Sequence, residues 1–352
     1  MVKFALVGCG RISKRHSQLL GENKILGAEL VAVCDKVLDK AEIISKRYSI
    51  PAYSCLHEMM KSTKIDVVVV LTESGFHAEH TLSLAPYGAH IIVEKPMALT
   101  LEDADAMIAA CDKYGIKLFV VKQNRFNVPV VELRKALEQG RFGKLIMGTV
   151  RVRWCRNQAY YDQDSWRGTW AYDGGVLTNQ ASHHLDLLEW MMGDVESVFA
   201  KSKTALVDIE AEDTAVVLLK FRNGALGIIE ATTAVRPKDL EGSISILGET
   251  GSVEIGGFAV NEMKTWNFSE SIDGDEDVTE KYSVNPPNVY GFGHQAYYEH
   301  VLDCLNNKTA QLVDGLEGRK SLELINAIYE SVETGREKFL RFIPKSSKLG
   351  RL

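Results

Sequence analysis

A glycine turn near the start of the chain has the residues needed to bind a dinucleotide phosphate. Gly8-Cys9-Gly10-Arg11-Ile12-Ser13 follows an apolar run and precedes a helical pattern. Gly8 permits a tight turn. Gly10 lets the backbone approach a pyrophosphate at the helix N-terminus, where free N–H groups favour anions. Ser13 stands where the usual fingerprint has its third glycine.

Asp35 ends the second apolar run, close to the roughly 20-residue spacing at which an acid binds the adenosine ribose hydroxyls. Its charge would repel a 2′-phosphate, which favours NAD over NADP, although Lys36 and Arg11 leave NADP open. An ordinary glycine turn with a helix-capping aspartate is the alternative interpretation. It does not explain why strand, turn, helix and acid occur in this order.

Glu94-Lys95-Pro96 directly follows the apolar run at 90–93. Ligands of open α/β sheets bind beyond the carboxyl ends of the strands, so Lys95 is expected to point toward the cofactor. The alternative is an exposed lysine paired with Glu94.

The elements that must position these residues change character near residue 122. Before it, expected strands alternate with expected helices, which implies parallel βαβ units. The strands are 3–7, 29–34, 67–71, 90–93 and 117–121, and the helices are 13–20, 37–48, 56–61, 77–87 and 101–114. After it, the expected strands follow one another closely, at 145–154, 197–205, 214–221, 225–234, 243–247, 252–255 and 263–268, with helices at 130–138, 182–192, 295–306 and 316–336.

We therefore predict an α/β protein with two domains. Residues 1–121 form an NAD-binding Rossmann domain with a parallel sheet. Residues 122–352 form an α+β domain with a large, mostly antiparallel open sheet, which binds substrate and mediates oligomerisation. The acidic stretch 269–280 is expected to be an exposed loop.

Composition narrows the kinds of partner. The chain has 41 basic and 47 acidic residues and a formal net charge of −6, which argues against nucleic acid or an anionic membrane as the main partner. The sequence has no apolar run of membrane-spanning length and no signal-peptide layout. Its six scattered cysteines indicate reduced thiols and a cytoplasmic location.

Four stretches in order resemble the glucose–fructose oxidoreductase, inositol dehydrogenase and rhizopine-catabolism (Gfo/Idh/MocA) family. They are the glycine turn, 72–77, Glu94-Lys95-Pro96 and 174–186. The resemblance implies a Rossmann domain, a second α/β domain whose open sheet builds dimers or tetramers, and hydride transfer between a sugar-like alcohol and NAD(P).

The resemblance also assigns the reacting groups. The family's lysine and histidine correspond to Lys95 and His183, whereas its aspartate corresponds to Asn179. Asn179 can hydrogen-bond a substrate but cannot act as a base. We favour His183 as the proton acceptor with Lys95 as its partner, and the reverse assignment stays open. The cofactor contacts implied are Gly8, Gly10, Arg11, Ile12, Asp35, Thr72, Ser74, His77, Glu94, Lys95, Gln123, Trp166 and Arg167.

Neighbouring histidines invite a metal interpretation, at His183 with His184 and at His77 with His80. Consecutive histidines on a helix point about 100° apart, and the sequence has no C-x-x-C or H-E-x-x-H motif. We expect no metal and structural roles for His184 and His80.

The segment 151–170 contains four arginines and five aromatic residues. Guanidinium groups suit carboxylates and phosphates, and aromatic faces suit a sugar or base ring. This is more positive charge than a neutral sugar needs. The alternative is a basic strand face beside a buried aromatic cluster.

This segment, together with 123–125, 179–183, 240–249 and 290–294, resembles the bacterial UDP-N-acetylglucosaminuronate 3-dehydrogenases of surface (lipo)polysaccharide synthesis. That branch implies oxidation of the 3-hydroxyl of a UDP-sugar to a ketone, which an aminotransferase then uses. Some members regenerate NAD⁺ with 2-oxoglutarate. The substrate contacts implied are Lys95, Arg156, Tyr160, Tyr161, Arg167, Asn179, Ser182 and His183, and Trp166-Arg167 is also placed beside the nicotinamide.

Two other functions compete with this one. Another sugar or inositol dehydrogenase of the family would gain little from the arginines. A non-catalytic NAD-binding regulator would not need Lys95 and His183 together.

Overall fold

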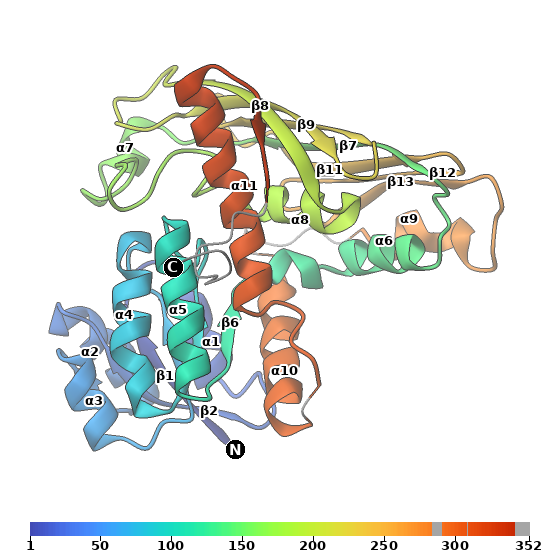
Figure 1. Cartoon of the computed structure of the whole chain (residues 1–352). Helices are drawn as coiled ribbons and strands as arrows, with labels where there is room; N and C mark the ends of the chain where they lie inside the picture. Colours follow the sequence, from blue (N-terminus) through green and yellow to red (C-terminus); the bar gives the residue numbers. More distant parts are fainter. Residues whose placement is uncertain (284–290, 308, 342–352) are drawn as a thin grey trace, which may run out of the picture.

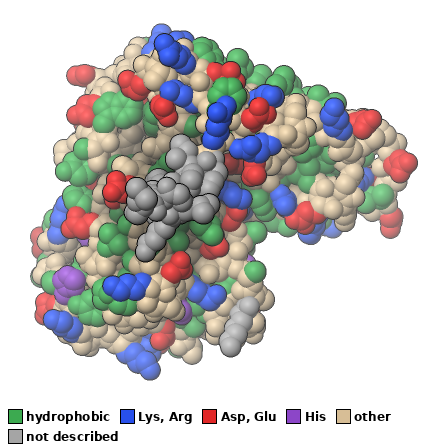
Figure 2. All heavy atoms as spheres, in the orientation of Figure 1, with side chains coloured by type: hydrophobic (Ala, Val, Ile, Leu, Met, Phe, Trp, Pro, Cys, Tyr) green, Lys and Arg blue, Asp and Glu red, His purple; other side chains and the backbone are tan. Residues whose placement is uncertain are grey.

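Two β-sheets, one from each half of the chain, organise the molecule (Figure 1). The computed structural model describes residues 1–283, 291–307 and 309–341. Within these residues, no helix is both long enough and apolar enough to cross a membrane. On the face drawn in Figure 2, basic and acidic side chains are interspersed and form no continuous basic surface.

The first sheet is parallel and has the strand order β3-β2-β1-β4-β5-β6. Its strands are β1 (Val2–Val7), β2 (Ala28–Cys34), β3 (Ala52–Tyr53), β4 (Val67–Val70), β5 (His90–Val93) and β6 (Leu118–Val120). The helices are α1 (Ser13–Gly21), α2 (Leu38–Tyr48), α3 (Leu56–Ser62), α4 (His77–Leu84) and α5 (Leu101–Lys113). All four valines of β4 are buried, because helices cover both faces of the sheet. The predicted Rossmann architecture is confirmed, and the strand order reverses between β1 and β4, where ligands of such sheets bind.

The second sheet has eight strands in the order β13-β12-β11-β7-β10-β9-β8-β14. They are β7 (Leu145–Arg153), β8 (Val195–Lys203), β9 (Thr214–Phe221), β10 (Leu226–Thr232), β11 (Glu241–Gly248), β12 (Gly251–Gly256), β13 (Glu262–Phe268) and β14 (Lys338–Phe339). Strands β7 and β10 pair in parallel, and the other pairings between described strands are antiparallel. The predicted mostly antiparallel sheet is therefore confirmed.

Among the described residues, helices cover one face of the second sheet and leave the other open. Helices α6 (Val128–Glu138), α8 (Ser182–Met192) and α11 (Gly315–Thr334) lie on the side that faces the first half (Figure 1). Leu188 and Met192 of α8 pack on Gly148 of β7, where any β-carbon would lie 2.7 Å from their side chains. On the open face, Val216 and Leu218 are about half exposed.

Helix α10 (Gly293–Asn306) crosses back to the first sheet (Figure 1). Its residues Tyr298 and Val301 share one apolar core with Phe4 and Leu6 of β1. A helix from the predicted second domain thus completes the core of the first half. The division between residues 121 and 122 stays a prediction.

The acidic stretch 269–280 is mostly exposed, as predicted, but the prediction that it is a loop throughout is wrong. The stretch contains the 3₁₀ turn η4 (Asp275–Asp277) and the start of helix α9 (Val278–Lys281). Arg141 donates to Asp275 at 2.6 Å and Trp266 donates at 2.7 Å, and Val278 is buried. The chain folds here because Arg141, which is distant in sequence, and Trp266, on the preceding strand, both bind one carboxylate of the acidic stretch.

Candidate active site

A cleft of about 410 Å³ lies at the carboxyl ends of the first sheet's strands, and residues from both halves line it. Every predicted cofactor contact lines this cleft, namely Gly8, Gly10, Arg11, Ile12, Asp35, Thr72, Ser74, His77, Glu94, Lys95, Gln123, Trp166 and Arg167. Arg156, Tyr160, Asn179 and His183 line it as well. The structure therefore brings most of the predicted site together in one place.

The glycine turn leaves backbone exposed to the cleft. Gly8 has a φ of 97°, and a β-carbon there would lie 2.7 Å from the carbonyl carbon of Leu71. A β-carbon on Gly10 would meet no atom of the protein within 4 Å, so the space beside it is free for a ligand. Ser13, in the place of the third glycine, is buried and donates to the Gly10 carbonyl at 2.6 Å. The turn fits a pyrophosphate at the start of α1.

Asp35 holds the glycine turn as well as facing the cleft. One carboxylate oxygen accepts from the backbone N–H of Cys9 at 2.7 Å, and the other accepts from that of Val37 at 2.8 Å. Each carboxylate oxygen can accept a further hydrogen bond, so ribose hydroxyls fit here. Lys36 lies 3.3 Å from Glu73 and is thereby engaged in an ion pair.

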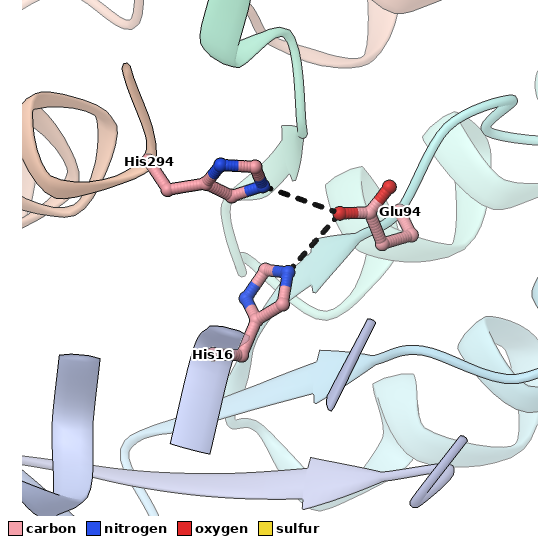
Figure 3. Close-up of side chains that lie close together, drawn as sticks. All are labelled: His16, Glu94 and His294. Carbon is pink, nitrogen blue, oxygen red and sulfur yellow. Dashed lines mark hydrogen bonds and ion pairs between the residues drawn. The ribbon is translucent and has the colours of Figure 1, made fainter. Parts of the chain in front are cut away.

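Two buried histidines hold the carboxylate of Glu94 (Figure 3). Nε2 of His16 lies 3.1 Å and Nε2 of His294 lies 3.9 Å from Oε1, while Oε2 accepts from the backbone N–H of Lys95 at 2.9 Å. Burial alone would raise the pKa of Glu94, but the hydrogen bond from His16 and the nearby His294 bring this pKa well below its usual value. The ionised carboxylate anchors the turn that carries Lys95.

These three side chains also place potential ligand atoms within 4.8 Å of one another. The contact between His16 and Glu94 has the length of a hydrogen bond. The prediction that the protein holds no metal stays a prediction. No local sequence pattern singles out His16 or His294, because the fold alone brings them to Glu94.

His77 links the loop that follows β4 to the loop that follows β5. Its Nδ1 lies 2.7 Å from the carbonyl oxygen of Pro96 and its Nε2 lies 3.0 Å from that of Thr72. The pKa of His77 is lowered by burial. Its position supports the cleft wall, and its predicted contact with the cofactor stays a prediction.

Lys95 reaches across the cleft to the second half. Its Nζ donates to the backbone carbonyl of Asn179 at 2.6 Å. Burial lowers the pKa of Lys95, and the charges of Glu94 and Asp173 oppose this shift. A lysine with a lowered pKa can exchange a proton nearer neutral pH than an ordinary lysine.

His183 lies in the first turn of α8 and is buried. Nε2 of His183 lies 2.9 Å from the amide nitrogen of Gln123. Burial and the positive charges of Lys95 and Lys122 bring the pKa of His183 well below its usual value. The imidazole is therefore neutral at neutral pH, and the same shift makes it a weaker base than an exposed histidine.

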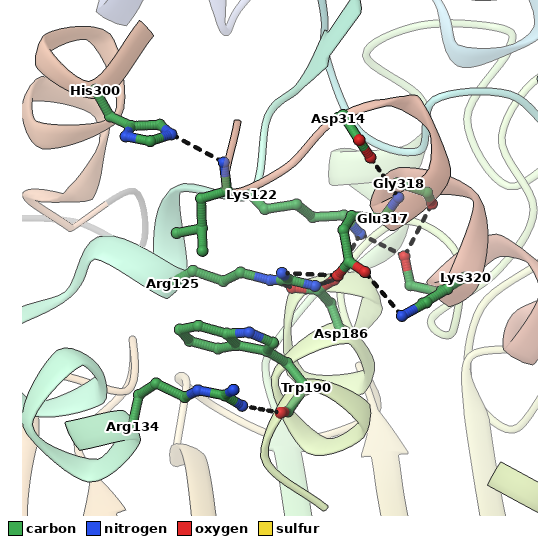
Figure 4. A network of polar contacts seen from close by, with 12 residues as sticks. Lys122, Arg125, Arg134, Asp186, Trp190, His300, Asp314, Glu317, Gly318 and Lys320 are labelled. Atoms are coloured by element: carbon green, nitrogen blue, oxygen red, sulfur yellow. Dashed lines mark hydrogen bonds and ion pairs between the residues drawn. The ribbon is translucent and has the colours of Figure 1, made fainter. Parts of the chain in front are cut away.

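A buried ion-pair network fixes the short helix η3 (Gln123–Phe126) against α8 (Figure 4). Arg125 donates to both oxygens of Asp186, at 2.8 and 2.9 Å, and to Glu317 of α11 at 3.1 Å. Lys122 lies 3.5 Å from Asp186. Gln123 lies on η3 and His183 lies on α8. The network that joins η3 to α8 therefore determines the distance between these two residues. Arg125 and Asp186 each stand in a stretch that carries the family resemblance, but no sequence pattern indicates that they pair with each other.

Three guanidinium groups surround the ring of Tyr160 at the cleft. The guanidinium carbons lie 4.9 Å (Arg167), 5.4 Å (Arg156) and 5.9 Å (Arg11) from the ring centre. Arg156 also pairs with Asp239 at 2.9 Å, and Arg167 donates to the hydroxyl of Tyr160 at 3.0 Å. Arg11 comes from the glycine turn, so the cluster spans both halves of the molecule.

The other two arginines of the 151–170 segment lie elsewhere. Arg151 and Arg153 lie on β7 and pair with Glu241, and Arg153 also pairs with Glu230 on β10. For these two residues the alternative of a basic strand face is correct. Alternation along a strand places every second side chain away from the cleft.

Two predicted substrate contacts do not line the cleft. Tyr161 is buried, and its hydroxyl lies 3.1 Å from Thr233 Oγ1. Ser182 is buried at the start of α8. His184 packs edge-on against Trp154, and His80 lies 3.0 Å from the hydroxyl of Thr72. Tyr290, part of the narrower resemblance, lies outside the described residues.

Comparisons with known proteins agree with this geometry. Residues 2–122 match the model of the oxidoreductase family NAD-binding Rossmann fold, and residues 134–339 match that of the family's C-terminal alpha/beta domain. The myo-inositol 2-dehydrogenase of Thermotoga maritima is 29% identical over 95% of this chain and 97% of its own length. The D-apiose dehydrogenase of Paraburkholderia graminis is 27% identical over 95% of this chain and 88% of its own length.

Two solved structures are more similar. The WlbA dehydrogenase from Bordetella pertussis, in complex with NADH and UDP-GlcNAcA, is 43% identical with a TM-score of 0.90, covering 97% of this chain and 98% of that chain. The WlbA dehydrogenase from Chromobacterium violaceum, in complex with the same two molecules, is 43% identical with a TM-score of 0.91, covering 97% of each chain. The chain belongs to the Gfo/Idh/MocA oxidoreductase family and is an NAD-dependent dehydrogenase.

Proposed function

We propose that this enzyme oxidises the 3-hydroxyl of UDP-N-acetylglucosaminuronate to a ketone. The observation that carries the proposal is the cluster of Arg11, Arg156 and Arg167 around Tyr160, in the same cleft as Lys95 and His183. A diphosphate and a carboxylate both need cationic partners, and guanidinium groups bind both with paired hydrogen bonds. The two WlbA dehydrogenases that were crystallised with UDP-GlcNAcA support this substrate class.

Bound NAD⁺ supplies the hydride acceptor in this reaction. His183 is the base: its neutral imidazole accepts the proton of the sugar hydroxyl. Lys95, beside it in the cleft wall, hydrogen-bonds the oxygen and stabilises the negative charge that develops there. The side chain of Asn179 adds a hydrogen bond and no charge. The assignment with Lys95 as base and His183 as partner remains the alternative.

Gln123 adds a requirement to this mechanism. An amide N–H that donates to Nε2 of His183 occupies the lone pair that would accept a proton. The sugar hydroxyl must take the place of the Gln123 donor, because an amide oxygen turned toward the ring would require Nε2 to carry a proton already. Proton transfer is therefore coupled to substrate entry.

One assay separates this function from that of the sugar and inositol dehydrogenases to which the chain is also similar. The purified protein is incubated with NAD⁺ and, in parallel, UDP-N-acetylglucosaminuronate, myo-inositol or D-apiose. We expect NADH and a sugar nucleotide lighter by two hydrogen atoms with the first substrate alone. Turnover with inositol and none with the nucleotide sugar would reject this substrate but not the family. NADH formation with any of them excludes a non-catalytic regulator.

The same assay with 2-oxoglutarate tests cofactor recycling. If the enzyme reduces 2-oxoglutarate with the NADH it has formed, 2-hydroxyglutarate appears and net NADH does not accumulate. The keto sugar has the carbonyl that an aminotransferase converts to an amine, so such an enzyme is the proposed consumer of the product.

We also propose that a second copy of the chain covers the open face of the second sheet. Phe199 on β8 pairs with Leu218 on β9, which pairs with Ile228 on β10, so their side chains form an apolar row on this face. Exposed apolar rows of this kind are typical of subunit interfaces. Whether two or four chains assemble is an outcome of the oligomerisation experiment described below.

A further inference from the structure

Asp173 is a buried carboxylate behind the catalytic residues that the sequence analysis did not single out. Its side chain accepts from the backbone N–H of Gly168 at 2.8 Å and from the side-chain amide of Asn179. Only 2% of its surface is exposed. Asp173 does not line the cleft, whereas its hydrogen-bond partner Asn179 does.

The contact with Asp173 determines how Asn179 is oriented. An ionised carboxylate can only accept hydrogen bonds, so the NH₂ end of the amide must face Asp173 and the oxygen must face away. The backbone carbonyl of the same asparagine accepts from Nζ of Lys95 at 2.6 Å. Asn179 therefore connects Asp173 to the lysine at the reaction centre.

The charges of Asp173 and Lys95 also act on each other directly. Burial lowers the pKa of Lys95, and the negative charges of Glu94 and Asp173 counteract this. Burial raises the pKa of Asp173, and its hydrogen bonds together with the charges of Lys95 and Arg167 counteract that. Each charge thus reduces the cost of burying the other.

We propose that Asp173 is a positioning residue for the reaction, which holds Asn179 and Lys95 in place and supplies the negative charge that Asn179 lacks. The inference rests on the proposed role of Lys95. By the family resemblance, this carboxylate is expected at position 179, where this chain has asparagine. The structure shows a carboxylate six residues earlier, at Asp173, in the turn that precedes the motif containing His183.

The first test is Asp173→Asn, with kcat and kcat/KM measured between about pH 5.5 and 10, a range that brackets the reference pKa values of histidine and lysine. Removing the negative charge lowers the pKa of Lys95, so the limb of the profile that reports Lys95 moves to lower pH, by about half a pH unit or more. This direction holds whether Lys95 acts as acid or base. We expect kcat to fall by about tenfold or more, because Asn179 also loses its fixed orientation. The KM for NAD⁺ should change by less than about twofold.

The second test exchanges the two side chains in the double variant Asp173→Asn/Asn179→Asp. The introduced asparagine would accept from Gly168 with its amide oxygen and donate to the introduced aspartate with its amide nitrogen. Every partner is then satisfied and the carboxylate is restored, so we expect most of the lost kcat to return and the limb to move back toward its original pH. Thr178→Val is the matched control, since Thr178 bonds Tyr329 in the same turn and carries no charge. It should leave the pH profile unchanged.

An unmoved limb in Asp173→Asn, or an equal shift in Thr178→Val, would overturn the role of Asp173. Failure of the unmodified enzyme to oxidise UDP-N-acetylglucosaminuronate would instead overturn the proposed function. In that case the profiles are measured with whichever sugar the enzyme does oxidise. A crystal structure of Asp173→Asn in which Asn179 and Lys95 keep their contact and orientation would also overturn the inference, and it requires no substrate.

Discussion

The amide nitrogen of Gln123 lies 2.9 Å from Nε2 of His183. Gln123 follows the last strand of the first sheet, whereas His183 belongs to the helix that supports the second sheet, and both line the cleft. The contact therefore crosses between the two halves of the enzyme. A change in either half that moves one of these residues alters the environment of the proposed base.

Replacement of this base is the most direct test of the mechanism. His183→Asn should lower kcat by about 10²- to 10⁴-fold, the usual contribution of a general base. The affinity for NADH, measured by fluorescence titration, should change by less than about twofold. His57→Asn, at an exposed histidine, serves as the control. A variant that raised only the KM for the sugar would show that His183 positions the substrate and does not accept its proton.

The arginine cluster predicts recognition of an anion. Arg156→Ala should raise the KM for UDP-N-acetylglucosaminuronate by about 10- to 100-fold, because a charge-assisted hydrogen bond contributes roughly 1.5–3 kcal/mol. Its kcat should change little. Arg47→Ala removes an exposed arginine paired with Glu22 and should have no effect. Equal values of KM for Arg156→Ala and the unmodified enzyme would place the substrate anions elsewhere.

Cofactor preference should depend on Asp35. Asp35→Ser removes the charge that opposes a 2′-phosphate, while Lys36 and Arg11 remain nearby. We expect the ratio of kcat/KM for NAD⁺ over NADP⁺ to fall by at least about tenfold. Because Asp35 also accepts from Cys9, the glycine turn should loosen and raise the KM for NAD⁺ itself. An unchanged ratio would mean that another residue selects the cofactor.

Glu212 predicts that stability depends on pH. Burial raises its pKa to about 7 from an ordinary value of 4.5. The folded state binds the proton of Glu212 more tightly than the unfolded state does. Protonation of Glu212 therefore stabilises the fold fully below about pH 4.5, and this stabilisation is lost as the pH rises through 7. Glu212→Gln should therefore gain stability relative to the unmodified protein between about pH 5 and pH 8, by at most roughly 3 kcal/mol.

Chemical denaturation at the two pH values measures this difference. Glu276→Gln changes a glutamate in the η4 turn and should show the same difference from the unmodified protein at both pH values. A Glu212→Gln variant whose relative stability is the same at both pH values would contradict the prediction.

The open sheet face predicts how the enzyme assembles. Leu218→Glu places a charge in the middle of the apolar row and should shift the protein toward monomers in light scattering after size-exclusion chromatography. Glu280→Lys, in the acidic stretch away from this face, is a surface control. If the unmodified protein has the molar mass of a monomer, the proposed assembly is rejected. Otherwise the measured mass distinguishes a dimer from a tetramer.

Five of the six strands of the first sheet were predicted from sequence to within one residue at each end. The run of valines in β4 and the predicted helix 182–192 agree with the observed elements because local periodicity determines them. Strand β3 was missed because its two residues are too few to show a pattern.

The sequence predicted residues that meet in the cleft, Lys95 and His183 among them, but not the contacts that support them. Lys95 and His183 stand in recognisable motifs. Asp186 binds Arg125, which is 61 residues away in sequence. Asp173 bonds its local neighbours Gly168 and Asn179, and its link to Lys95 forms only because the backbone carbonyl of Asn179 meets Nζ of Lys95, 84 residues away.

Arg153 and Arg156 are close in sequence but lie in different places. Arg153 is on strand β7 and points to the sheet face, whereas Arg156 follows the strand and lines the cleft.

Helix α10 makes the two halves inseparable. Its Tyr298 contacts the ring of Phe4 and lies 2.6 Å from Nδ1 of His16, which in turn holds Glu94. A gene fragment that stopped after the last strand of the first sheet would encode the glycine turn, Asp35 and Lys95, but it would expose an uncovered apolar surface to water. Excising the Rossmann half as a portable module therefore requires grafting this helix, or a replacement for it, onto the fragment.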